Sequence, residues 1–142
     1  MDKIVVNGNR PLSGAVKISG AKNAVLPVMA ATLLAPGKYS IENVPDLRDT
    51  RTMMKLLNII GAKTIFDKGS LTIDSSSANN PEAPYDLVKT MRASFYVLGP
   101  LVSRFGRVNV SLPGGCAWGP RPVDYHLKGL EQLGAKLNLD GG

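Results

Sequence analysis

Two segments of the chain carry apolar residues at the spacing of an amphipathic helix. In the first, the apolar side chains fall at i, i+3, i+4 and i+7, namely Met53, Leu56, Leu57 and Ile60. This spacing places them on one face of a helix. We expect Asp49 to cap the amino terminus of this helix, and Gly61 to end it in the left-handed conformation that glycine adopts easily.

The second segment repeats the first at an offset of 73 residues, because residues 57–63 recur in similar form at 130–136. Its apolar stripe consists of Val123, Leu127, Leu130 and Leu133. Pro122 suits the first turn of this second helix, and Gly134 is expected to end it. The two segments therefore predict two copies of one structural unit.

Each of these helices is followed by a short alternating segment that predicts a β-strand, at residues 63–66 and 136–139. In the first copy, turn residues and a partner strand at 70–73 complete a hairpin. In the second copy the sequence reaches only the turn at 140–142. A hairpin with one strand leaves an unpaired edge, so we expect the second unit to be cut off at this turn.

Two further helices are predicted. The first spans 21–34, with an apolar stripe of Val25, Leu26, Met29 and Leu33, and is compatible with Pro27 only near its first turn. The second spans 86–104 and should be kinked at Pro100, because proline removes a backbone donor.

Each of these helices precedes a predicted strand, at 39–42 and at 108–111. Residues 74–84 are rich in Ser, Asn and Pro and predict an exposed connector. The order of elements predicts an α/β (α+β) fold built from βαβαββ units.

The second copy is longer than the first between its strand and its helix. Gly37 and Gly106, which introduce the two strands, lie 69 residues apart, so the offset of 73 at the helix ends means four inserted residues. The insertion falls within 113–120, a glycine-containing loop that holds the single cysteine, Cys116. Such loops let the backbone approach a ligand and often carry function. A lone cysteine is more commonly a small buried hydrophobe, and that alternative stays open.

Composition narrows the class of protein. The 142 residues are 44% hydrophobic and 20% charged, enough for one globular core. No apolar run approaches the roughly 20 residues of a membrane span, and residues 1–6 lack the order of a signal peptide, so we expect a cytoplasmic protein without a membrane partner. One cysteine and one histidine provide neither an internal disulfide nor a Cys/His zinc site, so no structural metal is expected.

The formal net charge of +6 favours anionic partners. The 17 Lys and Arg residues are spread singly, and the aromatic residues are only one Trp, four Tyr and three Phe. Nucleic-acid-binding proteins typically combine clustered basic residues with interleaved aromatics. The pattern therefore favours a small phosphorylated substrate over nucleic acid.

Three motifs occur in order: Ser-Gly-Ala-Lys-Asn-Ala at 19–24, Met-Arg-Ala-Ser at 91–94, and a stretch at 113–124 that runs from Pro-Gly-Gly-Cys to Arg-Pro-Val-Asp. Together they resemble the UDP-N-acetylglucosamine enolpyruvyl transferases, over all 142 residues. The resemblance implies transfer of the enolpyruvyl group of phosphoenolpyruvate to the 3′-hydroxyl of UDP-N-acetylglucosamine, with release of phosphate and no cofactor. It implies a cytoplasmic transferase that catalyses the first committed step of peptidoglycan synthesis. Cell shape and cell division depend on this synthesis, and the resemblance also implies a target of fosfomycin.

The same resemblance implies the fold and the domains. The family has a two-domain inverse α/β barrel of βαβαββ units, with its active site between the domains. Residues 1–20, with strands at 3–6 and 15–18, would belong to the second domain. Residues 21–142 would form part of the first domain, and the remainder of the enzyme beyond residue 142 would complete the site.

Three site residues follow from the resemblance for phosphoenolpyruvate. Cys116 matches the general acid that protonates the methylene carbon and can add to it covalently. Lys22 and Asn23 match phosphoenolpyruvate contacts, and a position at a helix start suits an anion. The alternative for Lys22 is a solvated lysine at a helix start.

The residues implied for UDP-N-acetylglucosamine are Arg92, Arg121, Pro122, Val123, Asp124 and Tyr125. Arg121 would lie between the two substrates, and Asp124 would accept a hydrogen bond from the base or sugar. The alternatives are a helix-capping turn at Pro122 and a surface charge at Arg92. His126 is left outside the chemistry, because a lone helical histidine more often has a structural or solvated role.

Two rival interpretations stay open. Enolpyruvyl transferases that act on shikimate 3-phosphate share the fold and a lysine like Lys22 but lack the cysteine loop, so Cys116 argues against them. Alternatively, the chain is a non-catalytic substrate-binding or structural fragment, because the family's aspartate base and several arginines come from sequence beyond Gly142. Trp118 and Pro120 depart from the family's usual small or aliphatic loop residues, although Cys116 and Arg121 are retained.

Overall fold

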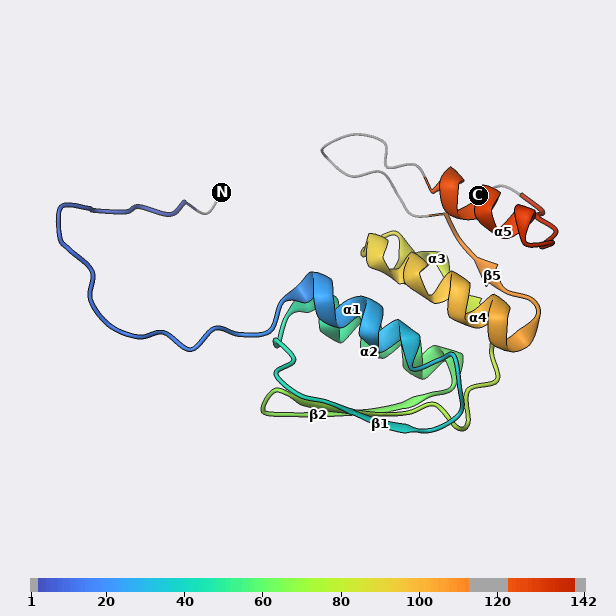
Figure 1. Ribbon diagram of the computed structural model, residues 1–142, viewed down its shortest axis with the longest axis horizontal. Helices are drawn as coiled ribbons and strands as arrows, with labels where there is room; N and C mark the ends of the chain where they lie inside the picture. The colour runs from blue at the N-terminus through green and yellow to red at the C-terminus, as the bar shows by residue number, and fades with distance from the viewer. Residues whose placement is uncertain (1–2, 113–122, 140–142) are drawn as a thin grey trace.

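The computed structural model describes residues 3–112 and 123–139. Its first unit has two layers, in which α1 (Lys22–Ala31) and α2 (Arg48–Ile60) lie side by side over a three-stranded antiparallel sheet (Figure 1). The strands are ordered β1 (Lys38–Ile41), β3 (Ser70–Asp74), β2 (Lys63–Asp67). The predicted strands and hairpin of the first copy are thereby confirmed.

The core of this unit lies between the helices and the sheet. The predicted stripe of α2 is completely buried, at Met53, Leu56, Leu57 and Ile60. Leu71 and Ile73 of the central strand join the same core, as does the stripe predicted for 21–34 at Val25, Leu26, Met29 and Leu33. Because each buried side chain of this size stabilises the fold by about 1.5–3 kcal/mol, these two stripes hold the unit together.

The hairpin between β2 and β3 closes through a two-residue turn. Lys68 and Gly69 both have positive φ angles, 43° and 87°, as in the type I′ turn that matches the twist of paired strands. Gly61 ends α2 with a φ of 101°, which confirms its predicted role at the helix end.

The start of α2 differs from the prediction. The N-cap is Leu47, and Asp49 lies inside the first turn instead of capping it. The hydroxyl of Thr50 makes the polar contacts at this helix start, because its Oγ1 accepts a hydrogen bond from the Leu47 N–H at 3.0 Å and lies 2.9 Å from the Pro45 carbonyl. The Asp49 side chain therefore makes no capping hydrogen bond at this helix start.

α1 is shorter than the predicted 21–34, and Pro27 lies in its second turn, not its first. A proline here removes the N–H that would bond to the carbonyl of Asn23. Both residues are exposed, so water can replace the lost bond.

The prediction of one kinked helix over 86–104 is wrong. The segment forms three short elements, α3 (Tyr85–Val88), a 3₁₀ helix η1 (Arg92–Val97) and α4 (Leu98–Phe105). The break lies at Met91, which is extended with φ −147° and ψ 106°. Pro100 lies in the first turn of α4, just after η1 ends, so the interruption of the predicted helix is not at the proline.

The second unit contributes β5 (Asn109–Val110) and α5 (Asp124–Gln132), and β5 pairs in parallel with β4 (Glu82–Ala83). No residue of α5 is buried, so its predicted stripe is only partly covered.

The two helix ends confirm the internal repeat. In the first unit Ala62 N–H donates to the Leu57 carbonyl at 2.9 Å, and in the second Ala135 N–H donates to the Leu130 carbonyl at 3.0 Å. The intervening glycine has positive φ in both, as in a Schellman motif. The same local sequence has folded twice into the same helix end.

The connector at 74–84 is less exposed than predicted, because Ser75, Ala78 and Ala83 are buried. Arg104 of α4 reaches across to it, and donates hydrogen bonds to the Ser75 carbonyl at 3.0 Å and the Leu33 carbonyl at 3.2 Å. This arginine therefore ties α4 to the end of α1 and to the connector.

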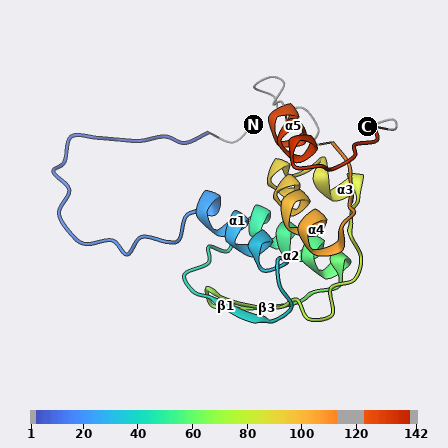
Figure 2. The ribbon, with the colours of Figure 1, turned by 45° about the vertical axis from the view of Figure 1, so that its right-hand side comes forward.

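Residues 3–21 run as an extended arm away from the body (Figures 1 and 2). The strands predicted at 3–6, 15–18 and 136–139 are not formed, because none of these segments pairs with another strand in the described parts of the chain. The assignment of residues 1–20 to a second domain stays a prediction. Among residues 3–112 and 123–139, each helix is too short or too polar to span a bilayer.

Candidate functional site

A polar cavity of about 660 Å³ brings together residues from both units. Four of the predicted site residues line it: Lys22, Asn23, Arg92 and Val123. The other lining residues are Leu26, Asp49, Thr90, Met91, Ala93, Phe95, Tyr96 and His126. The predicted residues thus converge from three separate elements on one place.

The amino terminus of α1 supplies the first two of these residues, Lys22 and Asn23. The N-cap residue Ala21 makes no side-chain capping bond, and the first turn contains no acidic residue. The positive end of the helix and its first N–H groups therefore stay available for an anion, beside a lysine ammonium and an amide.

The Lys22 ammonium is paired with a carboxylate at the cavity. Its Nζ lies 2.8 Å from Oδ2 of Asp49, in the first turn of α2. Lys22 is therefore not simply a solvated lysine, although 46% of its side chain is exposed. The sequence marks Asp49 only as an ordinary acidic residue at a helix start, so it carries no signal for this pairing.

Arg92 reaches the cavity because the helical segment is interrupted at the preceding residue, Met91. Met91 is extended and buries its side chain in the core, which leaves the next residue, Arg92, exposed at the cavity as the first residue of η1.

Residues at the start of α5 line two different cavities. Val123, the N-cap, lines the polar cavity, whereas Tyr125 lines a neighbouring, more apolar cavity of about 430 Å³. Asp124 lines neither, and its Oδ2 lies 3.7 Å from Nζ of Lys128. The predicted nucleotide-binding segment is therefore only partly gathered at the polar cavity.

His126 lines both cavities, and its ring lies 6.2 Å from the ring of Phe95. The sequence prediction set this residue aside. His126 lies three residues after Val123, a spacing that puts both on one side of a helix. This spacing is the signal that would have marked His126 as a site residue.

The remaining predicted residues, Cys116, Arg121 and Pro122, lie outside the described residues. Their roles stay predictions. In the described parts of the chain, no group of three or more His, Cys, Asp or Glu residues is arranged to hold a metal ion.

The fold and the cavity together define an α/β protein in which a lysine and a helix amino terminus lie at one polar cavity, an arrangement that suits an anionic ligand. Residues 6–142 match the family described as EPSP synthase (3-phosphoshikimate 1-carboxyvinyltransferase). The chain belongs to this family of enolpyruvyl transferases.

Within the family, the chain is similar to proteins named UDP-N-acetylglucosamine 1-carboxyvinyltransferase. It is 57% identical over 143 residues to the one from Chloroherpeton thalassium and 56% identical over 142 residues to the one from Trichlorobacter lovleyi. Both alignments cover 100% of this chain but only 33% and 34% of the relative, so the chain spans about a third of their length.

A solved structure supports the fold class. The enolpyruvyl transferase NikO from Streptomyces tendae matches 67% of this chain and 22% of its own, with a TM-score of 0.61 and 37% sequence identity. The predicted α/β fold of the enolpyruvyl transferase type is thereby confirmed.

Proposed function

We propose that the chain forms part of a UDP-N-acetylglucosamine 1-carboxyvinyltransferase. The observation that carries the proposal is the cavity where Lys22, Asn23, Arg92 and Val123 converge. The similarity of the whole chain to relatives of that name favours UDP-N-acetylglucosamine over shikimate 3-phosphate as the acceptor.

The reaction needs cations around phosphoenolpyruvate, an acid at carbon and a base for the hydroxyl. In the first step the acceptor oxygen bonds to C2 of phosphoenolpyruvate while C3 gains a proton, and the hydroxyl proton passes to a base. In the second step the C2–O bond to phosphate breaks and C3 loses a proton, which restores the double bond. Lys22 and Asn23 bind the anion in this proposal, and Cys116 donates the proton to C3.

The UDP-N-acetylglucosamine side of the site consists of Arg92 and residues 121–125 in this proposal. Support comes from Arg92 and Val123 at the polar cavity and from Tyr125 at the adjoining apolar cavity. Residues 1–20 belong in this proposal to the second domain of the full enzyme, with the active site between the two domains. The enzyme works in the cytoplasm in peptidoglycan synthesis.

The direct test is a chimaera in which residues 1–142 replace the corresponding third of the Chloroherpeton thalassium relative. We expect it to release phosphate from phosphoenolpyruvate only when UDP-N-acetylglucosamine is present. The isolated chain should release little or none, because the predicted base and further arginines come from the rest of the enzyme. An inactive but folded chimaera would contradict the proposed function. Normal turnover by the isolated chain would contradict the need for further sequence.

Cys116 has its own prediction. The epoxide fosfomycin should alkylate the chimaera once, and mass spectrometry of tryptic peptides should locate the adduct on Cys116. A thiolate is the reactive form, and Arg121 and loop amides would favour it. The Cys116→Ser variant should gain no adduct. Modification elsewhere, or none with and without UDP-N-acetylglucosamine, would argue against Cys116 as the reactive residue.

A further inference from the structure

Asp49 is the one acidic side chain among the described residues that line the polar cavity. A carboxylate beside a site for phosphoenolpyruvate repels the phosphate and carboxylate of that ligand. Its presence therefore calls for a role that offsets this repulsion. The contact with Lys22 supplies one.

The pair of Asp49 and Lys22 joins the starts of two helices. Lys22 is the first residue of α1 and Asp49 lies in the first turn of α2, and their charged atoms are 2.8 Å apart. Only 29% of the Asp49 side chain is exposed, against 46% for Lys22. The carboxylate is therefore the more firmly embedded partner, and the lysine is the one that reaches toward solvent.

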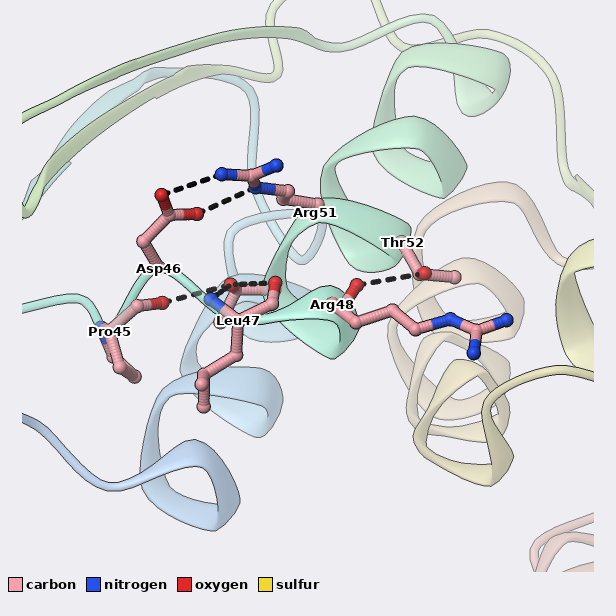
Figure 3. A network of polar contacts seen from close by, with 7 residues as sticks. Pro45, Asp46, Leu47, Arg48, Arg51 and Thr52 are labelled. Atoms are coloured by element: carbon pink, nitrogen blue, oxygen red, sulfur yellow. Dashed lines mark hydrogen bonds and ion pairs between the residues drawn. The ribbon is translucent and has the colours of Figure 1, made fainter. Parts of the chain in front are cut away.

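The first turn of α2 is itself held in place by a network of polar contacts (Figure 3). The Thr50 hydroxyl accepts a hydrogen bond from the N–H of the N-cap residue Leu47 at 3.0 Å. Asp46 accepts two hydrogen bonds from Arg51, at 2.6 and 2.7 Å, and these bonds lower the pKa of Asp46. Asp49 therefore projects from a turn that Thr50 anchors, whereas the exposed Asp46–Arg51 pair adds little to this anchoring.

We propose that Asp49 is a positioning residue for phosphoenolpyruvate binding, acting through Lys22. The carboxylate restricts the rotamers of a long, flexible lysine and holds its ammonium at the cavity before the substrate arrives. The conformational freedom of Lys22 is then lost on folding and not on binding. The inference rests on the proposed function, in which Lys22 binds phosphoenolpyruvate.

A purely structural role for Asp49 predicts different behaviour. An acidic residue in a first turn stabilises its helix through the dipole, and such an effect would be independent of Lys22. Asp46 provides a matched control, because it forms an ion pair of similar length three residues earlier but does not line the polar cavity.

The test is a double-mutant cycle in the chimaera, with phosphoenolpyruvate affinity measured by equilibrium titration and turnover by phosphate release. Asp49→Ala should lower kcat/KM for phosphoenolpyruvate about tenfold or more, with KM for UDP-N-acetylglucosamine unchanged. Asp46→Ala should change neither. In a Lys22→Ala background, Asp49→Ala should cause no further loss of affinity.

An equal loss from Asp49→Ala with and without Lys22 would overturn the inference, as would equal effects of Asp49→Ala and Asp46→Ala. If circular dichroism shows that Asp49→Ala does not fold, Asp49→Asn carries the same cycle, because it removes the charge and keeps the shape. A parent chimaera that folds but transfers no enolpyruvyl group would overturn the proposed function instead, and the inference with it.

Discussion

The Lys22→Ala variant of the chimaera should lose about 10²–10³-fold in kcat/KM for phosphoenolpyruvate, the range seen when one preorganised charge-stabilising donor is removed. Lys22 lies at an uncapped helix amino terminus, in a cavity that also contains Asn23 and Arg92. Its loss removes the point charge and also leaves Asp49 without a partner, so that a carboxylate faces the incoming anion. Both changes act against phosphoenolpyruvate in the same direction.

Lys55→Ala is the matched control, because Lys55 is an exposed lysine on α2 that does not line this cavity. It should retain full activity. Lys22→Arg keeps the charge but replaces a compact ammonium by a planar fork, and should recover only part of the loss. Steady-state kinetics with each substrate varied in turn give the result. A Lys22→Ala variant as active as Lys55→Ala would show that the cavity is not the phosphoenolpyruvate site.

Sequence periodicity predicted the first unit well because its elements depend on local signals. The stripe from Met53 to Ile60, the glycine at 61 and the two-residue turn before Ser70 each have a direct physical reason in neighbouring residues. The same signals identified the repeat, and the hydrogen bonds at Gly61 and Gly134 confirm it.

The segment 86–104 shows where periodicity fails. Its apolar residues at alternating spacings of three and four are Val88, Met91, Phe95, Leu98 and Val102, of which the first four are buried and Val102 is partly buried. The helix is nevertheless interrupted at Met91. The spacing of buried residues cannot reveal an interruption of the helix when the segments before and after it bury their side chains in the same core. This interruption is also what exposes Arg92 at the cavity.

The candidate site also combines residues that the sequence could predict with residues that it could not. Lys22, Asn23, Arg92 and Val123 could be predicted because they belong to motifs, and the structure brings them together. Asp49 and His126 were not predicted as site residues, because an acid in a first turn and a histidine on a helix are ordinary features until tertiary packing sets them beside the motif residues. Tyr125 lines the neighbouring cavity because it lies on a different side of α5 from Val123.

Gly20→Ala should disturb the junction between the arm and α1 more than any other glycine substitution among the described residues. A Cβ at this position would overlap the carbonyl oxygen of Asn43 and lie 3.3 Å from Cδ of Pro45. Asn43 has a φ of 56°, a conformation that leaves its backbone little room to move. The clash is with backbone, so it cannot be relieved by rotating a side chain, and the start of α1 must shift instead.

Such a shift should cost about 1–3 kcal/mol of unfolding free energy, as overpacking typically does. It should also displace Lys22, two residues later, and a displacement of about 1 Å can reduce activity about 10²-fold. Denaturant unfolding of the chain and phosphate release by the chimaera would measure the two effects.

Gly129→Ala in the middle of α5 is the control, because a Cβ there meets nothing within 4 Å. In a helix interior, alanine should stabilise by about 0.5–1 kcal/mol relative to glycine. The same chemical change is therefore expected to act in opposite directions at the two positions. Equal unfolding midpoints for the two variants would mean that the close approach of Gly20 to Asn43 does not constrain the start of α1.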